Sequence, residues 1–283
     1  MGENNFKDSR MKDIEERIKK NIIRDYGNIQ SKEELEKHIV QHQEHKANLF
    51  EDYIAKYFPK DFFKDKTVLE IGCGFGGNII HLRKHYTRNA YGIDLDKDAI
   101  DIAKDIAIQE NIDKDAFLHC AAEEITSKID TKFDVIISLQ VLEHVQDVKK
   151  SIEEMLVLLK EGGYIFIHVP NYDSKFETHY RLKMPSNKKE DFIEILKAQG
   201  IDTAFAESLN FVNKSYFDDI LNSLKGEYKL SYILPYDTEF YRKNFNLKQK
   251  NVILRYFPFA GKLLRYLIYK VKAPASLVVI IKK

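Results

Sequence analysis

The sequence predicts an α/β protein with a doubly wound, mostly parallel seven-stranded sheet, an antiparallel last strand, N-terminal helices and a C-terminal helical insertion. Two patterns indicate this class. Between residues 67 and 169, short apolar runs alternate with amphipathic stretches, which is typical of parallel strands with helices on both faces. The two last strands, near 228–234 and 276–281, have no crossover helix of the usual length between them. We therefore expect them to form a terminal hairpin.

The first part of the chain is charged and has a helical pattern from about residue 10 to residue 58. The pattern is broken near Gly27, in the sequence Tyr-Gly-Asn. Ser31 followed by Glu34 has the spacing of a capping box that opens a second helix. These signals predict a helical extension over residues 1–60.

The main domain is predicted over residues 61–283, and its elements follow in a regular order. The predicted strands before the hairpin lie at 67–71, 91–94, 116–120, 133–138 and 164–169. The predicted helices lie at 78–86, 97–110, 149–160, 188–198 and 214–224. After Pro170 a loop rich in aromatic and charged residues covers 171–187, where we expect a substrate to bind. A basic helical insertion is expected over 237–273.

The composition is that of a folded protein. Of the 283 residues, 44% are hydrophobic and 12% aromatic, enough for a sizeable core. No apolar run approaches the roughly 18 residues that a membrane span needs, and the polar N-terminus lacks the apolar stretch of a signal peptide. The two cysteines, Cys73 and Cys120, are too few for a disulfide framework. We expect a soluble, cytoplasmic protein.

The charge is distributed unevenly along the chain. From Phe240 to the end there are eleven Lys and Arg and no acid, and nine of these cations lie within 240–273. Because the whole chain is +1, the remainder carries −10. A basic tail on an acidic body implies an anionic neighbour. The aromatic and aliphatic residues of 256–269 suit either of two helices. One would lie on anionic lipid at the inner membrane face, and the other would cover a substrate pocket. The acidic body argues against nucleic acid.

A glycine-rich segment, Glu70-Ile-Gly-Cys-Gly-Phe-Gly76, follows the first strand of the main domain and precedes a helix. Glycines at this place permit a tight turn and close approach of the backbone to a ligand. The spacing also fits the dinucleotide-binding fingerprint. Asp94 ends the next strand, where a carboxylate would accept both hydroxyls of a ribose.

Four segments together resemble the motifs of class I, Rossmann-like S-adenosylmethionine-dependent methyltransferases. They are Val68-Leu-Glu-Ile-Gly-Cys-Gly-Phe-Gly76, Tyr91-Gly-Ile-Asp94, Phe133-Asp-Val-Ile-Ile-Ser-Leu-Gln-Val-Leu-Glu-His144 and Leu158-Leu-Lys-Glu-Gly-Gly-Tyr-Ile-Phe-Ile-His-Val-Pro-Asn171. The resemblance covers about residues 67–171. The Leu-Glu-His after the fourth strand is similar to the subgroup that includes ubiquinone-pathway O-methyltransferases and many sugar and small-molecule enzymes.

This resemblance implies S-adenosylmethionine as the cofactor and the extension 1–60 as its lid. In such a site Glu70 would face the amino group of the methionine moiety. The backbone of the glycine loop would pack under the cofactor, through Gly72, Cys73, Gly74 and Gly76.

The remaining cofactor contacts follow from the later motifs. Asp94 would bind the ribose and Leu95 would lie against the adenine. The family often has an acid after strand three, but Ala121 stands there. Either Glu123 takes its place or Ala122 holds the base through its backbone. The residues that end strand four, Leu139 and Gln140, would border the sulfonium.

An oxygen acceptor must also lose a proton, which favours a histidine or a carboxylate near the methyl group. We predict His144 and His179 as the catalytic residues. Alternatively, Glu143 and His144 belong to a structural turn at the end of the strand. His168 is alternatively a half-buried strand residue. No metal site is predicted, because the helical trio of His38, His42 and His45 lacks a cysteine or an obvious carboxylate partner.

The sequence thus predicts an S-adenosylmethionine-dependent methyltransferase for a small-molecule, sugar or lipid-linked acceptor, most simply by O-methylation. N- or C-methylation by the same fold stays open, as does a catalytically silent binding subunit. The sequences of strands four and five argue against a nicotinamide-dependent enzyme. The fold alone does not identify the acceptor.

Overall fold

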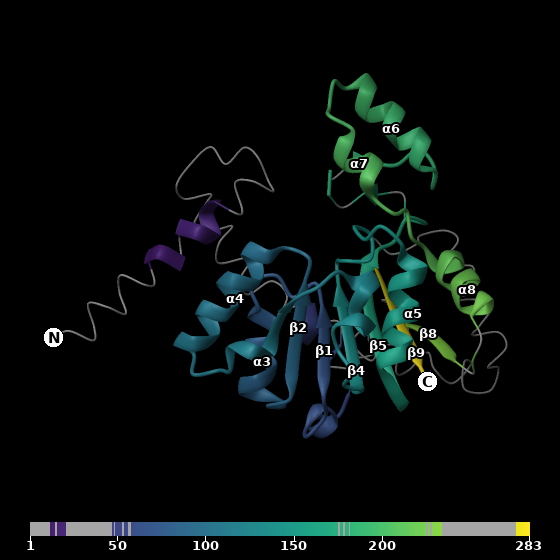
Figure 1. The fold of residues 1–283 in the computed structure, drawn as a ribbon. Helices are drawn as coiled ribbons and strands as arrows, with labels where there is room; N and C mark the ends of the chain where they lie inside the picture. Colours follow the sequence, from purple (N-terminus) through teal and green to yellow (C-terminus); the bar gives the residue numbers. More distant parts are fainter. Residues whose placement is uncertain are drawn as a thin grey trace, which may run out of the picture. The chain divides into compact units, whose positions relative to one another are not determined.

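The computed structural model describes residues 12–14, 16–20, 47, 49–52, 54–55, 58–174, 176–177, 179–180, 182–224, 226, 228–233 and 276–283 (Figure 1). The chain divides into two compact units. The first comprises Met1–Leu139 and Val157–Lys160, and the second comprises Gln140–Leu156 and Glu161–Lys283. The break near Gly27, the capping box and the insertion 237–273 lie outside the described residues, so these remain predictions. The boundary at residue 60 also remains one.

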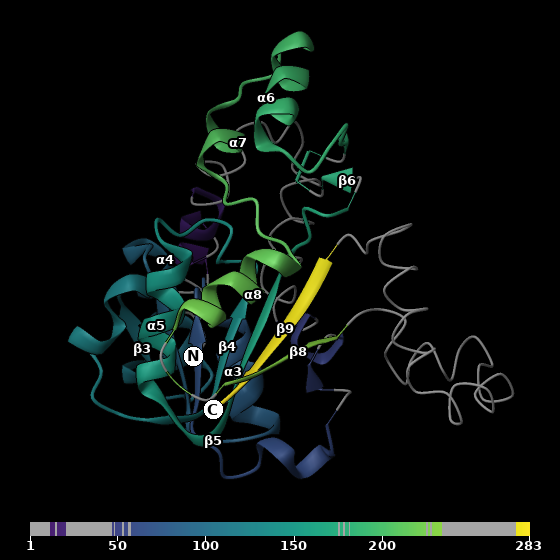
Figure 2. The same ribbon diagram turned by 90° about the vertical axis from the view of Figure 1, so that its right-hand side faces the viewer.

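A seven-stranded sheet has the order β3-β2-β1-β4-β5-β9-β8. Its strands are β1 (Val68–Ile71), β2 (Ala90–Asp94), β3 (Phe117–His119), β4 (Phe133–Leu139), β5 (Leu159–Pro170), β8 (Lys229–Ile233) and β9 (Ser276–Lys282). β1 pairs in parallel with β2 and β4. β9, which passes close to β8 and β5 in Figure 2, pairs antiparallel with both. The seven strands, the antiparallel last strand and the terminal hairpin are therefore confirmed.

The first unit is built around β1, whose four residues are all buried. α3 (Gly77–His85) contacts β2, and α4 (Lys97–Gln109) contacts β2 and β3. α4 begins where the Asp96 carboxylate accepts hydrogen bonds from the amides of Asp98 and Ala99. It buries one apolar stripe, made of Ala99, Ile100, Ile102, Ala103 and Ala107. Three short 3₁₀ turns, η2 (Lys60–Phe63), η3 (Lys114–Ala116) and η4 (Ala122–Ser127), complete the connections between described elements.

The second unit contains the helices α6 (Lys189–Ala198), α7 (Ala204–Ser208) and α8 (Lys214–Ser223), and nearly all of α5 (Val148–Leu158) and β5. Asn210 connects two of its loops. The Asn210 amide donates to the Glu143 carbonyl at 2.7 Å, and its side-chain Nδ2 donates to the Val145 carbonyl at 2.6 Å. The segment that follows β4 is thereby held against the segment that follows α7.

Three local predictions differ from the structure. The helix predicted at 149–160 ends at Leu158, and β5 begins at once and runs through Gly162. Gly162 has φ +74° and donates to the Lys283 carbonyl, so this glycine shapes the strand end that pairs with β9 and does not close a helix. The loop 171–187 contains a two-strand pair, β6 (Phe176–Glu177) and β7 (Leu182–Lys183), and α7 was not predicted.

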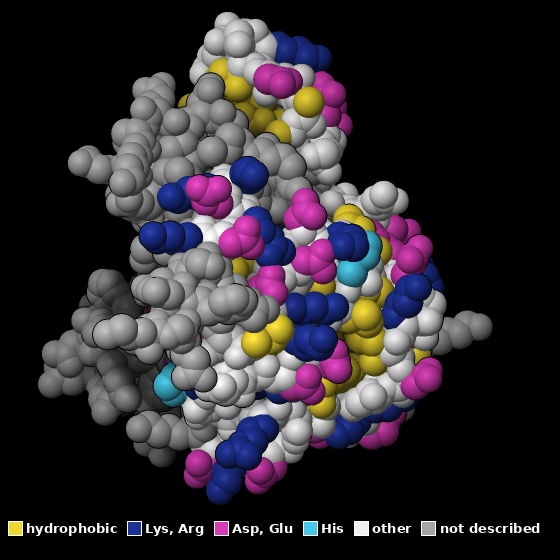
Figure 3. Space-filling view, turned by 60° about the vertical axis from the view of Figure 1, so that its left-hand side comes forward, with side chains coloured by type: hydrophobic (Ala, Val, Ile, Leu, Met, Phe, Trp, Pro, Cys, Tyr) yellow, Lys and Arg dark blue, Asp and Glu magenta, His cyan; other side chains and the backbone are white. Residues whose placement is uncertain are grey.

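The surface in Figure 3 carries Lys and Arg intermingled with Asp and Glu. Ion pairs of this kind include Lys84–Glu110 and Lys97–Asp101, both 2.6 Å between nitrogen and oxygen. None of the helices in the described part of the chain combines the length and apolarity that crossing a bilayer requires.

Candidate functional site

The glycine loop connects β1 to α3. Gly72, Gly74 and Gly76 all have positive φ, at 69°, 54° and 78°. At Gly76 a side chain is excluded twice over, because a Cβ there would also lie 2.5 Å from Phe117 Cε1. The loop therefore exposes its own backbone in a conformation that requires glycine. This is the local geometry that the sequence predicted for a ligand-binding turn.

Asp94 ties this loop to the end of β2. Its Oδ2 accepts from the Gly74 amide at 2.7 Å, and its Oδ1 accepts from the Asp96 amide at 2.9 Å. The Cys120 amide donates to the Asp94 carbonyl at 2.9 Å. An ionised carboxylate has about four lone-pair positions, so two remain for a pair of ribose hydroxyls. The structure thus brings together Gly74 and Asp94, as the sequence predicted.

Gly92 was not predicted as a site residue, although it positions the loop. A Cβ at Gly92 would lie 2.7 Å from Cys73 Cβ and 3.0 Å from Ile79 Cγ1. The glycine loop can therefore lie on β2 only because position 92 has no side chain. A glycine inside a strand is a signal of close backbone approach, and this signal was present in the sequence.

The other predicted cofactor residues of the first unit differ in exposure. Glu70 is fully buried in β1, Cys73 is 2% exposed, and Leu139 is buried at the end of β4. Ala122 is buried at the start of η4, and Glu123 beside it is half-buried. Gln140 belongs to the second unit; it has φ +54°, and its amide donates to the His168 carbonyl at 2.7 Å.

Leu95 is 68% exposed, an unusual state for an aliphatic side chain next to a buried strand. His119 Nε2 lies 2.9 Å from the Leu95 carbonyl and holds this loop, a contact that sequence reasoning missed. An exposed leucine on an ordered loop can stack against a flat base. Its exposure fits the predicted contact with adenine.

The described part of the N-terminal extension packs on the glycine loop. Ile14 and Ile18, both within 1% of full burial, form one apolar cluster with Phe75 of the loop and with Ile102 of α4. The Arg17 guanidinium is 2.5 Å from the Asp105 carboxylate. The described residues Ile14 and Ile18 therefore pack on the loop, and the role of the extension as a lid stays a prediction.

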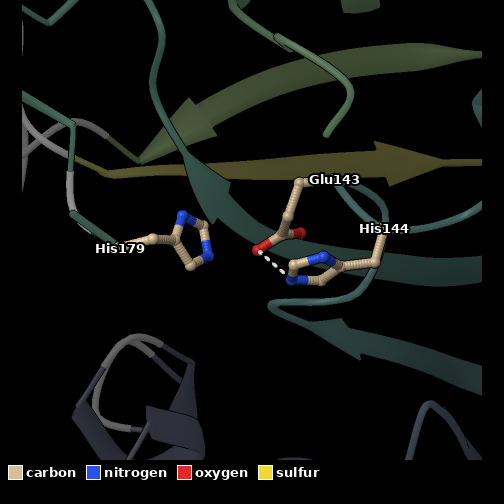
Figure 4. Close-up of side chains that lie close together, drawn as sticks. All are labelled: Glu143, His144 and His179. Atoms are coloured by element: carbon tan, nitrogen blue, oxygen red, sulfur yellow. Dashed lines mark ion pairs between the residues drawn. The ribbon is translucent and has the colours of Figure 1, made fainter. Parts of the chain in front are cut away.

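The two histidines predicted as catalytic lie together in the second unit (Figure 4). Their ring centroids are 5.5 Å apart in an edge-to-face arrangement. His144 Nε2 is 3.9 Å from Glu143 Oε1, and Glu143 is fully buried. Glu143, His144 and His179 each offer one ligand atom, all within 4.8 Å of one another, so the group could also hold a cation. His168 is 3% exposed within β5, as expected of a strand residue.

Glu177 organises this site and was missed by the sequence. Its side chain is 1% exposed. It accepts hydrogen bonds from His179 Nδ1 and the Tyr180 amide, both at 2.7 Å, and from the Tyr172 hydroxyl at 3.2 Å. Burial acts to raise the pKa of this carboxyl, but the hydrogen bonds from His179 and Tyr180 outweigh it, and the pKa is lowered. Burial, with Glu177 nearby, raises the pKa of Tyr172. Glu177 is therefore the ionised member of the group.

A pocket of about 320 Å³ opens beside His179. It is lined by His179, Tyr180, Ile201, Asp202 and Phe205. The Phe205 ring is 5.4 Å from the His179 ring and 5.7 Å from the His144 ring, between centroids. The imidazole thus borders an aromatic pocket that could hold a small organic molecule.

Comparisons of the sequence with known proteins point to one family. A family described as methyltransferase domain matches residues 41–215. The ubiquinone biosynthesis O-methyltransferase of Coxiella burnetii is 33% identical over 112 residues, which are 40% of this chain and 47% of that protein. The ajmaline N-methyltransferase of Rauvolfia serpentina is 29% identical over 104 residues, 37% of this chain and 36% of that protein. The chain spans less than half the length of these curated relatives.

Solved structures agree on the fold. A plantazolicin methyltransferase, in complex with a triazolic desmethylPZN analog and SAH, has a TM-score of 0.55 and 17% identity, covering 96% of this chain and 97% of that one. An S-adenosylmethionine dependent methyltransferase from Mesorhizobium loti has a TM-score of 0.50 and 13% identity, covering 83% of this chain and 97% of that one. At such identities the likeness concerns the fold.

Proposed function

Since the chain belongs to the methyltransferase domain family, we propose that it transfers the methyl group of S-adenosylmethionine to a small-molecule or glycan hydroxyl. The observation that carries the cofactor is the Asp94 carboxylate, hydrogen-bonded to Gly74 and so fixed beside the glycine loop. The observation that favours an oxygen acceptor is the His144–His179 pair, with a pocket beside His179.

The residues of the first unit fit this cofactor. Position 76 of the loop has no room for a side chain, Leu95 offers an exposed apolar surface, and Asp94 retains lone pairs for hydroxyls. Bound S-adenosylmethionine supplies an electrophilic sulfonium methyl group. Glu70 and the loop backbone would hold the methionine end, with Ala122 or Glu123 at the adenine.

The second unit would bind the acceptor and remove its proton. His144 lies five residues after Leu139, which is predicted to border the sulfonium. An imidazole near the acceptor hydroxyl can take the proton as the oxygen bonds to the methyl carbon. Positioning and exclusion of water supply most of the remaining acceleration.

N-methylation is the second candidate, because the ajmaline enzyme among the relatives acts on nitrogen and an amine acceptor has less need of a base. A silent binding subunit would have no reason to keep the Asp94–Gly74 contact. The acceptor decides between the chemistries. Mass spectrometry of the product formed with isotopically labelled S-adenosylmethionine would locate the new methyl group on oxygen or nitrogen.

The basic insertion 240–273 lies outside the described residues. Its nine cations and lack of acids favour acceptors that carry phosphate, such as a lipid-linked or nucleotide-linked sugar. Contact with an anionic membrane is the alternative use. Cosedimentation with anionic and neutral vesicles separates the two: equal, negligible binding to both leaves only the pocket role.

Calorimetry tests the core of this proposal. S-adenosylhomocysteine should bind the full chain in the micromolar range, and nicotinamide dinucleotides should not bind. The opposite preference would remove the basis for methyl transfer.

A further inference from the structure

Glu177 and His179 form a pair whose geometry separates the two nitrogens of the imidazole. Glu177 is buried, and its oxygens accept hydrogen bonds from the Tyr180 amide and the Tyr172 hydroxyl, so the geometry is that of a carboxylate, which can only accept. His179 Nδ1, 2.7 Å from Glu177 Oε1, must therefore carry the proton of that bond. In the neutral ring Nε2 then has the lone pair, because only one nitrogen of a neutral imidazole is protonated.

The rest of the site keeps this arrangement in place. Glu177 Oε2 accepts a hydrogen bond from the Tyr180 amide, three residues further along the same loop. The carboxylate therefore cannot rotate without losing this bond. The Tyr172 hydroxyl donates to Glu177 Oε1, the same oxygen that faces His179, and the Tyr172 ring is stacked on Phe211 at 3.9 Å between centroids. The His179 ring is enclosed between His144 and Phe205.

His144 differs from His179 in its distance to the neighbouring acid and in its place relative to the pocket. Its Nε2 is 3.9 Å from Glu143 Oε1, beyond hydrogen-bond distance, and it does not line the pocket. His179 lines the pocket and has a carboxylate at hydrogen-bond distance. The pocket and the contact with Glu177 thus favour His179 over His144 as the base.

We propose that Glu177 is a positioning residue that fixes His179 in its Nδ1–H form, so that His179 Nε2 is the nitrogen that accepts the proton of the methyl acceptor. This assignment rests on the proposed function for its role in the reaction. The acceptor oxygen forms its bond to the methyl carbon, and the carbon–sulfur bond breaks with both electrons going to sulfur. The hydroxyl proton moves to Nε2, and the imidazolium so formed is stabilised by the Glu177 carboxylate.

The chain contains an internal control in the first unit. His81 also contacts a carboxylate, Glu51, but through Nε2 at 2.6 Å. Its neutral ring should therefore have the opposite tautomer. One protein thus offers both forms in one spectrum, under identical conditions.

Long-range proton–nitrogen NMR of the full chain with ¹⁵N-labelled histidine tests the tautomers. The spectrum is taken at alkaline pH with EDTA, which keeps the rings neutral and free of cations. We expect His179 to show a protonated Nδ1 and an unprotonated Nε2, and His81 the reverse, with His179→Gln and His81→Gln assigning the signals. Glu177→Gln should convert His179 to a mixture of tautomers and leave His81 unchanged. A protonated Nε2 in wild-type His179 overturns the proposal, even if Glu177→Gln does not fold.

Chemical modification tests whether Nε2 is available at the pocket. Diethyl pyrocarbonate reacts with unprotonated imidazole nitrogen, and peptide mass spectrometry locates the adduct. We expect an adduct on His179, because its side chain lines the pocket and its Nε2 is unprotonated. An unreactive His179 would contradict the assignment. Neither measurement needs cofactor or acceptor, so a chain that fails to bind S-adenosylhomocysteine would lose the proposed function and could still retain this pair.

Discussion

Each of the two units contains a carboxylate that accepts hydrogen bonds from a histidine and a tyrosine. In the first unit Glu51 accepts from His81 Nε2 at 2.6 Å and from the Tyr86 hydroxyl at 2.7 Å. The Glu51 side chain is 40% exposed. Burial, and then Glu51, raises the pKa of Tyr86. This group fastens the segment before β1 to the end of α3.

In the second unit Glu177 is buried and binds its histidine through the other nitrogen, Nδ1. The side chains are of the same three types, and His179 borders the pocket of about 320 Å³. The comparison teaches that residue types alone do not separate a packing contact from a site for chemistry. The burial of the acid and the nitrogen that it engages make the difference.

The largest expected effect is on turnover. His179→Gln should lower turnover about 10²–10⁴-fold, because the base is lost while the pocket remains. His81→Gln should leave turnover within about twofold of wild type, because its ring serves packing. Steady-state rates with the acceptor found by product analysis measure both. Equal losses in the two variants would erase the distinction between the units.

His144→Gln sharpens the same comparison inside the second unit. We expect a smaller loss than for His179→Gln, since His179 lines the pocket and His144 is not among the residues that line it. The same steady-state assay applies. A larger loss for His144→Gln would reverse the assignment of the base.

Binding of the cofactor should depend on the first unit. Asp94→Ala should weaken binding of S-adenosylhomocysteine by about 1.5–3 kcal/mol, roughly 10- to 150-fold, the range of hydrogen bonds to a charged group. His179→Gln serves as the reciprocal control and should bind as wild type does. Calorimetry gives both constants. An unchanged constant in folded Asp94→Ala would mean that another residue holds the ribose.

Acid should weaken the second unit through Glu177. Because the pKa of its carboxyl is lower in the folded state than the ordinary value of 4.5, the ionised form stabilises the fold. That contribution is present above about pH 4.5 and is lost as the pH falls through the lower folded value. Urea denaturation at pH 7 and at pH 4 or below should show a smaller acid loss in Glu177→Gln than in wild type. Parallel losses would mean that Glu177 keeps an ordinary pKa.

The smallest effects are expected for the tyrosines. Tyr86→Phe and Tyr172→Phe each remove one hydroxyl that donates to a carboxylate, and should cost about 0.5–1.5 kcal/mol of unfolding free energy. Denaturant midpoints give the values. A cost above about 3 kcal/mol for either variant would indicate a disrupted core.

The strands, the hairpin and the glycine loop were predictable because their signals are local. Apolar runs such as 68–71 are short and bounded by polar residues, and Gly72 to Gly76 needs no distant contact to be recognised. The resemblance to class I methyltransferases, which rests on these segments, is confirmed by the family match and by the fold.

The acceptor side was only partly predictable. His144 and His179 were predicted from their places after strands. Glu177 was not predicted, because its burial depends on residues such as Tyr172 that fold around it. The contact of Ile18 with Phe75 was also beyond the sequence. Amphipathic pattern shows that a face is buried, and does not show against what.

The contact between Gly92 and Cys73 has a consequence for the history of this sequence. Because a carbon added at position 92 would lie 2.7 Å from the Cys73 Cβ, position 92 cannot gain a side chain while position 73 has one. Alanine at position 92 therefore requires that position 73 is already glycine, so the order of the two substitutions matters. We expect natural variants and laboratory selections to acquire the substitution at position 73 before the one at position 92. A variant that acquires Gly92→Ala first should fail to fold correctly.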